Sequence, residues 1–178
     1  GYPDGKGFPK IEILYNTLES HKAIAELIQS QLKRNLNIDV GLANQEWQKY
    51  LASRREGKFF IARAGWTGDY VDPITFLDLY ATENPSNHTR WSNAEYDALL
   101  AEAAECPDEK QRLQLLERAE RLLMDQVPTI PLYNYVDPNM TRPYVKGWYR
   151  NILDTHPLKY IYIDEEQKRE ILSDLKHH

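Results

Sequence analysis

The pattern of apolar and polar positions predicts alternating strands and helices in the first third of the chain. Residues 10–15 and 38–42 alternate with a period of two, and an apolar run at 59–63 predicts a third, buried strand. Residues 21–35 and 46–55 carry apolar side chains at helical spacing. The order strand, helix, strand, helix, strand predicts an α/β fold. Its sheet is mostly parallel, with right-handed crossovers and flanking helices.

Helices dominate the middle of the chain. A short helix is expected at 74–80, directly after Pro73. Residues 93–105 predict a longer helix that either Ser92 or Asn93 caps. Asp108 is expected to cap a second long helix that runs to about residue 126. These two helices predict a hairpin with charged outer faces.

The last third predicts two more strands and a polar helix. Residues 128–136 and 158–163 have strand-like composition, and the proline-rich stretch 137–157 between them predicts irregular structure. A final helix is expected at 165–176, with Asp164 as its cap. No linker is evident. We therefore expect one lobe over 1–178, built from segments 1–80, 81–127 and 128–178.

Polar side chains are expected along one edge of the predicted sheet. Ligands of parallel α/β sheets bind beyond the carboxyl ends of the strands. Asn16 and the nearby His21 follow the first predicted strand, and the segment from Arg63 to Asp69 follows the third. The topology therefore predicts a ligand site at the edge of the sheet where that segment lies.

The segment that follows the third strand combines groups suited to a zwitterionic ligand. Gly65 permits close approach of a partner, and Trp66 offers a flat apolar wall. Asp69 provides a negative charge for an ammonium group and Arg63 a positive one for a carboxylate. A peptide carries both groups. The structural alternative is a turn followed by a core aromatic side chain.

The composition of the chain argues against several classes of function. The formal net charge of −5 argues against nucleic acid as the main partner. Cys106 is the only cysteine, so an internal disulfide and a four-cysteine zinc site are excluded. No apolar run approaches the length of a membrane span, and the turn-rich first residues do not resemble a secretion signal. The chain also lacks an initiating Met, which suggests a fragment or a processed chain.

Enzymatic function has little support in the sequence. No GxSxG, P-loop or HExxH motif is present, and His88 and His156 lack metal-ligand spacing. Asp69 and Asp72 could form a carboxylate pair for glycoside hydrolysis, but no Glu is placed as the acid partner. We therefore expect a binding protein that needs no cofactor and no metal, and keep the hydrolase as an alternative.

The chain resembles the oligopeptide-binding proteins of ABC importers, the bacterial extracellular solute-binding proteins of family 5. The resemblance extends over roughly residues 1–164 by eye. It rests on a recurring arrangement of residues, which here reads Tyr15-Asn16-Thr17, His21-Lys22, Asn44-Gln45-Glu46-Trp47, Arg54, Ala62-Arg63-Ala64-Gly65-Trp66, Asp69-Tyr70 and Pro73.

This resemblance implies the C-terminal lobe of a two-lobe protein with the periplasmic-binding-protein-like fold of type II. It implies that Asp69 pairs with the α-ammonium group of a peptide and that Trp47 and Trp66 line side-chain pockets. The main chain at Gly65, Trp66 and Thr67 would pair with the peptide as a strand. The remaining expected ligand-binding residues are Arg54, Arg55, Arg63, His21 and Asn16, the four cationic ones as candidates for the peptide carboxylate.

The resemblance also implies partners and a location. Short peptides, a membrane permease and the other lobe of the protein are the expected partners, in the periplasm or at the cell surface. Some relatives have His at position 55 and Cys at position 67, which leaves the side-chain preference open. Relatives of the same fold carry dipeptides, nickel or sugars. A domain that binds a protein partner through its Trp-rich edge is the alternative from another class.

Overall fold

The computed structural model describes residues 1–136, 138–151 and 153–174. The chain divides into two compact units. The first combines Gly1–Thr67 with Phe76–Thr129, and the second combines residues 68–75 with the chain from Ile130 onward. These boundaries lie elsewhere than the three segments expected from the sequence. That one lobe contains the whole chain stays a prediction.

A parallel three-stranded sheet forms the centre of the first unit. After a short 3₁₀ turn at Pro3–Gly5, the chain forms β1 (Ile11–Asn16), α1 (Glu19–Leu36), β2 (Val40–Gln45), α2 (Trp47–Arg55) and β3 (Ile61–Ala62). The strand order is β2-β1-β3, and β1 is parallel to both neighbours. The α/β class with a parallel sheet and flanking helices is therefore confirmed.

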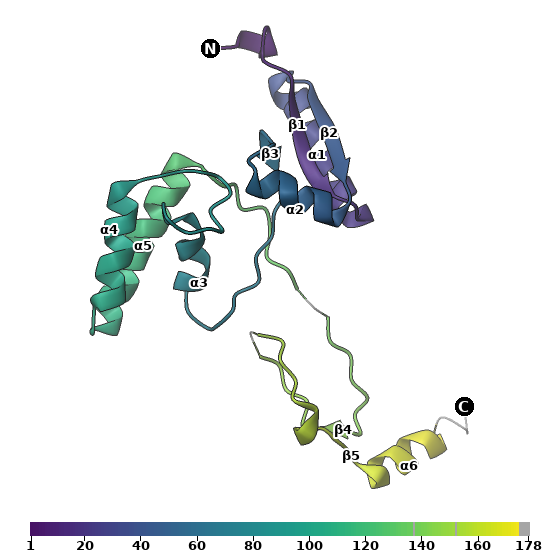
Figure 1. Cartoon of the computed structure of the whole chain (residues 1–178). Helices are drawn as coiled ribbons and strands as arrows, with labels where there is room; N and C mark the ends of the chain where they lie inside the picture. The colour runs from purple at the N-terminus through teal and green to yellow at the C-terminus, as the bar shows by residue number, and fades with distance from the viewer. Residues whose placement is uncertain (137, 152, 175–178) are drawn as a thin grey trace. The chain divides into compact units, whose positions relative to one another are not determined.

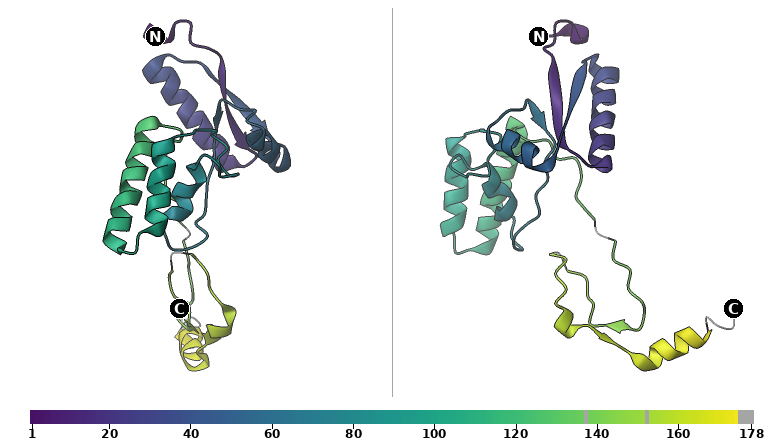
Figure 2. Two further views of the ribbon diagram at one scale, coloured as in Figure 1. Left: turned by 60° about the vertical axis from the view of Figure 1, so that its left-hand side comes forward. Right: turned by 45° about the vertical axis from the view of Figure 1, so that its right-hand side comes forward.

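The core of this sheet lies between β1, β2 and α1. Ile13 and Tyr15 of β1 are buried and pack with Ala25 of α1 and Val40 of β2. Figures 1 and 2 show α1 along one face of the strands. Gln29 of α1 reinforces this packing, because its Nε2 donates to the Val40 carbonyl oxygen at 2.6 Å.

The predicted helix limits are accurate to one or two residues. α1 begins at Glu19, two residues before the predicted start, and Leu18 at the cap position offers no side-chain acceptor. The helix ends at Leu36, and the cap residue Asn37 adopts a left-handed conformation at φ 53°. α2 starts as expected, with the Glu46 side chain accepting from the Gln48 backbone N–H.

The third strand is shorter and more exposed than its apolar sequence predicts. β3 consists of Ile61 and Ala62 alone, and Phe60 is 69% exposed. The expected buried strand at 59–63 is therefore wrong in length and in burial. A run of apolar residues predicts burial only where other residues cover it, and Phe60 has no such cover within the described chain.

An antiparallel hairpin of helices completes the first unit. A short helix α3 (Ile74–Leu77) and a 3₁₀ turn (Asp78–Tyr80) precede α4 (Ala94–Glu105) and α5 (Glu109–Gln126). Asp108 caps α5, as the sequence predicts, and of the two candidates for the cap of α4 it is Asn93 that accepts the hydrogen bonds. The contact between α4 and α5 is mostly apolar and centres on Leu99, Leu100, Ala103, Leu115, Leu116, Ala119 and Leu123.

The second unit contains little regular structure. Strands β4 (Val145–Lys146) and β5 (Tyr162–Ile163) pair antiparallel, and a 3₁₀ turn at Leu158–Tyr160 precedes β5. The expected strand at 158–163 therefore shrinks to two residues. α6 (Glu165–Asp174) follows, and its start is confirmed because Asp164 accepts a hydrogen bond from the Gln167 N–H at 3.1 Å.

The strand expected at 128–136 does not form. Over this stretch the described chain has no ladder partner, and the side chains of Ile130, Tyr133 and Val136 are 71%, 52% and 83% exposed. The rings of Tyr133 and Tyr135 contact edge to face at 5.1 Å. Strand propensity is realised only when a neighbouring strand supplies hydrogen bonds.

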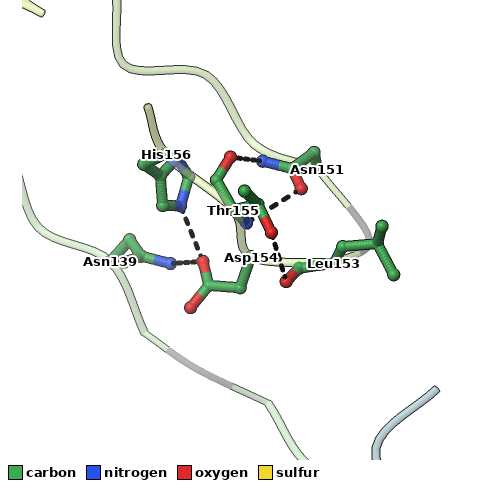
Figure 3. A network of polar contacts seen from close by, with 6 residues as sticks. All are labelled: Asn139, Asn151, Leu153, Asp154, Thr155 and His156. Atoms are coloured by element: carbon green, nitrogen blue, oxygen red, sulfur yellow. Dashed lines mark hydrogen bonds and ion pairs between the residues drawn. The ribbon is translucent and has the colours of Figure 1, made fainter. Parts of the chain in front are cut away.

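A polar network fixes the loop before β5 (Figure 3). The Asp154 carboxylate accepts from Asn139 Nδ2 at 3.1 Å and contacts His156 Nε2 at 2.7 Å. The His156 ring stacks on Trp148 with centroids 3.7 Å apart. The hydrogen bond from His156 lowers the pKa of Asp154. The network therefore ties Asn139 to residues 154–156.

Candidate functional site

The backbone of Arg63 is fixed at the carboxyl edge of the sheet. Its N–H donates to the Leu14 carbonyl oxygen at 2.8 Å, which extends the pairing of β1 and β3 by one residue. The Tyr50 hydroxyl donates to the Arg63 carbonyl oxygen. Tyr50 is 1% exposed and lies on α2, so this helix and the end of β3 are held together by a buried contact.

Tyr50 also organises two predicted site residues on α2. The Trp47 ring stacks on it with centroids 5.6 Å apart, and the Arg54 guanidinium lies over its ring at 5.5 Å. Trp47 is 48% exposed, which favours a pocket wall over a core position. Tyr50 was absent from the predicted site, although its spacing from Trp47 and Arg54 by one helical turn places all three on one side of α2.

His21, Asn16 and Arg63 come together at the same edge. His21 is buried at the start of α1, and its pKa is lowered first by burial and second by the positive charge of Arg63. A hydrogen bond to the Asn16 backbone raises the pKa of His21, but it is the smallest of the three causes. The imidazole is therefore neutral at pH 7. These three predicted residues form one polar cluster.

Gln45 adds a second amide to this edge. It is the register partner of Asn16 across β1 and β2. Asn16 Oδ1 and Gln45 Oε1 are both buried and have no hydrogen-bond partner among the described residues. Buried carbonyl oxygens are paired in most native structures, so two neighbouring exceptions indicate a place for a donor group. Gln45 was not among the predicted site residues, although it belongs to the quoted sequence arrangement.

The segment from Gly65 to Thr67 lies outside any helix or strand. Gly65, Trp66 and Thr67 are exposed, and Trp66 keeps 43% of its surface accessible. This excludes the alternative in which Trp66 is a core aromatic side chain. The exposed main chain follows directly on Arg63, whose own backbone is engaged.

Asp69 belongs to the second unit, which begins at Gly68. Its backbone N–H donates to Thr75 Oγ1 at 3.0 Å, and the residue is exposed. The helix-capping role falls to Asp72, whose Oδ1 accepts from the Ile74 N–H at 2.9 Å. Asp72 is thereby engaged in local structure.

Arg54 and Arg55 lie near His88. Their charges lower the pKa of His88, after burial as the larger cause. Arg90 of the same loop donates from Nη2 to the Glu56 carbonyl oxygen at 2.5 Å, directly after α2. The two arginines at the end of α2 therefore face a loop of their own unit.

Within the ranges that the structure describes, no three His, Cys, Asp or Glu side chains gather in a way that could hold a metal ion. In the same ranges, no helix has the length and apolar character needed to cross a membrane.

Comparisons with known proteins show which family the chain resembles. Residues 1–88 match the family model of bacterial extracellular solute-binding proteins, family 5 Middle. The dipeptide-binding protein DppE of Bacillus subtilis is 42% identical over 153 residues, which cover 86% of this chain and 27% of DppE. The periplasmic murein peptide-binding protein MppA of Escherichia coli is 42% identical over 139 residues, 78% of this chain and 26% of MppA.

A solved structure shows the same fold. The crystal structure of Haemophilus influenzae OppA in complex with RPPGFSPFR superimposes with a TM-score of 0.78 at 38% identity, and the match covers 92% of this chain and 32% of OppA. The chain thus spans about a quarter of the length of the curated relatives named above. These matches show that the chain belongs to the bacterial extracellular solute-binding proteins of family 5.

Proposed function

We propose that this chain is part of the extracytoplasmic substrate-binding component of an oligopeptide ABC importer and forms one wall of its peptide site. The observation that carries the proposal is the polar cluster of Asn16, Gln45, His21 and Arg63 at the carboxyl edge of the sheet. It lies next to an exposed main-chain segment that begins at Ala64. Buried polar groups without partners beside free backbone suit a peptide ligand.

Main-chain pairing supplies binding that tolerates many sequences. Gly65, Trp66 and Thr67 are exposed and outside any strand, so their N–H and C=O groups can pair with an extended peptide. Trp47 and Trp66 provide flat apolar surfaces for peptide side chains. Arg63 provides a fixed positive charge near that segment.

The peptide termini are assigned to charged residues. Asp69 pairs with the α-ammonium group, and Arg54, Arg55, Arg63 and His21 are the candidates for the carboxylate. Because burial and the charge of Arg63 keep His21 neutral at pH 7, His21 acts as a hydrogen-bonding group and not as a charge. Among the cationic candidates this leaves the three arginines for charge pairing.

The complete protein would close two lobes around the peptide by a hinge motion and then dock on a membrane permease. No chemistry is performed on the ligand in this function. The relatives named above are described as dipeptide-, murein peptide- and oligopeptide-binding. Because these descriptions cover different peptides, the proposal is made for short peptides without a set length. Periplasmic descriptions among the relatives support an extracytoplasmic location.

Two measurements on the complete protein test this proposal. Native mass spectrometry of protein purified without refolding should show a ladder of co-purifying short peptides, whereas a single non-peptide mass would contradict it. Calorimetric titration with a tripeptide should then show that Asp69→Asn weakens binding by about a hundredfold, because the ammonium loses its charged partner.

Asp72→Asn is the matched control, because asparagine caps a helix as well as aspartate does. It should leave the affinity within about twofold. An N-acetylated tripeptide should bind the unchanged protein as weakly as the free tripeptide binds Asp69→Asn, with no further loss when both changes are combined. Additive losses would remove Asp69 from the ammonium site.

A further inference from the structure

Positively charged side chains gather where α2 ends. Arg54 and Arg55 are the last two residues of this helix. Arg90 reaches the same place from the loop before α4, because its Nη2 donates to the Glu56 carbonyl oxygen at 2.5 Å. His88 of this loop lies close enough for the charges of Arg54 and Arg55 to lower its pKa, after burial as the larger cause. These two arginines, His88 and Arg90 are termed the α2-end cluster.

No carboxylate balances this cluster within the described part of the chain. Its three arginines form no ion pair there, and Glu56, which follows α2, pairs with Lys58 at 2.5 Å. His88 Nδ1 is buried without a hydrogen-bond partner in the same ranges. Positive charges held side by side repel each other, and buried ring nitrogens are usually paired. Both observations indicate that the cluster lacks an anionic group that accepts hydrogen bonds.

The loop that carries His88 is held in place on both sides of this residue. Asn87 Nδ2 lies within hydrogen-bonding distance of three backbone carbonyl oxygens, 2.9 to 3.2 Å away. The Arg90 guanidinium packs against Gly57, where an added Cβ would lie 2.5 Å from Arg90 Cζ. The cluster is therefore formed before any ligand binds, which lowers the entropic cost of binding an anion.

Neutralisation of the α2 dipole accounts for only part of the cluster. Basic side chains at the C-terminal end of a helix interact favourably with its partial negative charge, which is about half an elementary charge. Arg90 already donates to this helix end through the Glu56 carbonyl oxygen. Arg54 and Arg55 therefore provide more positive charge than the end of the helix balances.

We propose that the α2-end cluster binds the side-chain carboxylate of an acidic residue in the peptide, so that the protein prefers peptides that contain Asp or Glu. This inference rests on the proposed function and narrows its substrate class. The terminal carboxylate is left to Arg63 at the edge of the sheet, since the cluster lies at the end of a helix and not along the strands.

The members of the cluster have different roles. Arg54 and Arg55 supply the positive charge that pairs with the carboxylate. His88 is neutral at pH 7, because burial and the two arginine charges lower its pKa, and it supplies one N–H donor without adding a third charge.

The test is calorimetric titration of the complete protein with tripeptides that carry glutamate at the first, second or third position. Each is compared with the tripeptide that carries glutamine there, which has the same shape and no charge. We expect glutamate to bind about tenfold more tightly at one position. Arg54→Gln with Arg55→Gln should reduce this ratio to within about twofold. Arg118→Gln is the control, because Arg118 is exposed on α5 and its loss should leave the ratio unchanged.

His88 is tested separately. His88→Leu removes the ring donor and should lower the ratio of glutamate to glutamine affinity by about threefold. His88→Asn should restore most of it, because the asparagine Nδ2 can take the place of Nδ1. In NMR titrations, the glutamate peptide should raise the pKa of His88 and the glutamine peptide should not, since a nearby carboxylate favours the imidazolium form.

Three results would overturn the proposal and leave the proposed function intact. Equal affinities for glutamate and glutamine at every position would show that no acidic side chain is preferred. A preference that persists in the double arginine variant would assign it to another part of the protein. A loss of affinity on C-terminal amidation that is absent from the double variant would assign the cluster to the terminal carboxylate. If no tripeptide binds, the proposed function and this inference both fail.

Discussion

Asn16 and Gln45 face each other across the β1–β2 ladder, and the side-chain oxygen of each is buried without a donor in the described chain. An unpaired buried acceptor carries the cost of lost hydration with no compensating hydrogen bond. Such a pair therefore destabilises the folded state unless another molecule or segment supplies the hydrogen-bond donor.

Replacing Gln45 by methionine should therefore not destabilise the chain. Methionine has a similar shape and removes the unsatisfied amide, so we expect the free energy of unfolding to stay equal or to rise by up to about 1 kcal/mol. Urea titration measures this. Gln29→Met is the control, because Gln29 donates to the Val40 carbonyl oxygen at 2.6 Å. This control should lose about 1 kcal/mol. Equal losses in both variants would mean that Gln45 is satisfied.

Tyr50→Phe should affect both stability and binding. The change removes the hydroxyl that donates to Arg63 and leaves a carbonyl oxygen unpaired, at a cost of about 1–3 kcal/mol in unfolding free energy. Tyr96→Phe removes a similar buried hydroxyl, which donates to the Leu77 carbonyl oxygen at 2.6 Å. Both variants should be destabilised, but only Tyr50→Phe should weaken peptide binding by the complete protein. Equal binding by the two variants would separate Tyr50 from the site.

Stability should rise with pH across the titration of His21. The folded-state pKa lies below 6.5 because of burial and the charge of Arg63, so the unfolded state binds the proton more readily. The stabilisation is present above the unfolded pKa and is lost as the pH falls through the folded one. Urea titrations from about pH 5 to pH 8 should show this slope. His21→Gln should reduce it.

His88 contributes with the same sign, since burial and the charges of Arg54 and Arg55 also lower its pKa. In the double variant His21→Gln with His88→Gln, the free energy of unfolding should therefore change less with pH than in either single variant. If the free energy of unfolding of the unchanged chain does not vary with pH in this range, both assignments are contradicted. The two single variants also show how much of the slope belongs to each histidine.

Gly57→Ala should be more costly than Gly7→Ala. Both glycines have a positive φ, 69° and 76°, so alanine is strained at either position by about 1 kcal/mol. At Gly57, however, a Cβ would lie 2.5 Å from Arg90 Cζ, whereas at Gly7 the nearest atom is 4.0 Å away. The difference in unfolding free energy between the variants measures how firmly Arg90 is held. Equal values would show that Arg90 moves aside freely.

The structure could be predicted from the sequence where a residue's conformation depends on its near neighbours in the chain. Asp108 and Asp164 were predicted as helix caps and Asn93 as one of two candidates with Ser92, and each of the three accepts backbone hydrogen bonds at the start of its helix. Prediction failed where a distant partner decides the outcome. Residues 128–136 have the composition of a strand, but no strand pairs with them in the described chain.

For the site, sequence reasoning found the positions that flank the strands. Asn16, His21 and Arg63 were predicted and meet at one edge. It missed Tyr50 and Gln45, because their importance depends on what each side chain contacts or lacks after folding. The ligand-binding role of every one of these residues stays a prediction that the experiments above address.

The two hydrogen bonds of the Arg63 backbone restrict the register in which a peptide strand can pair with the protein. Its N–H is committed to Leu14 and its carbonyl oxygen to Tyr50, so neither group is free to pair with an incoming strand. The N–H and C=O of Ala62, one residue earlier, point to the edge of β3 that faces away from β1. A peptide that adds alongside can therefore pair with Ala62 or with residues from Ala64 onward but not with Arg63, so the protein's own sheet decides the alignment of a bound peptide.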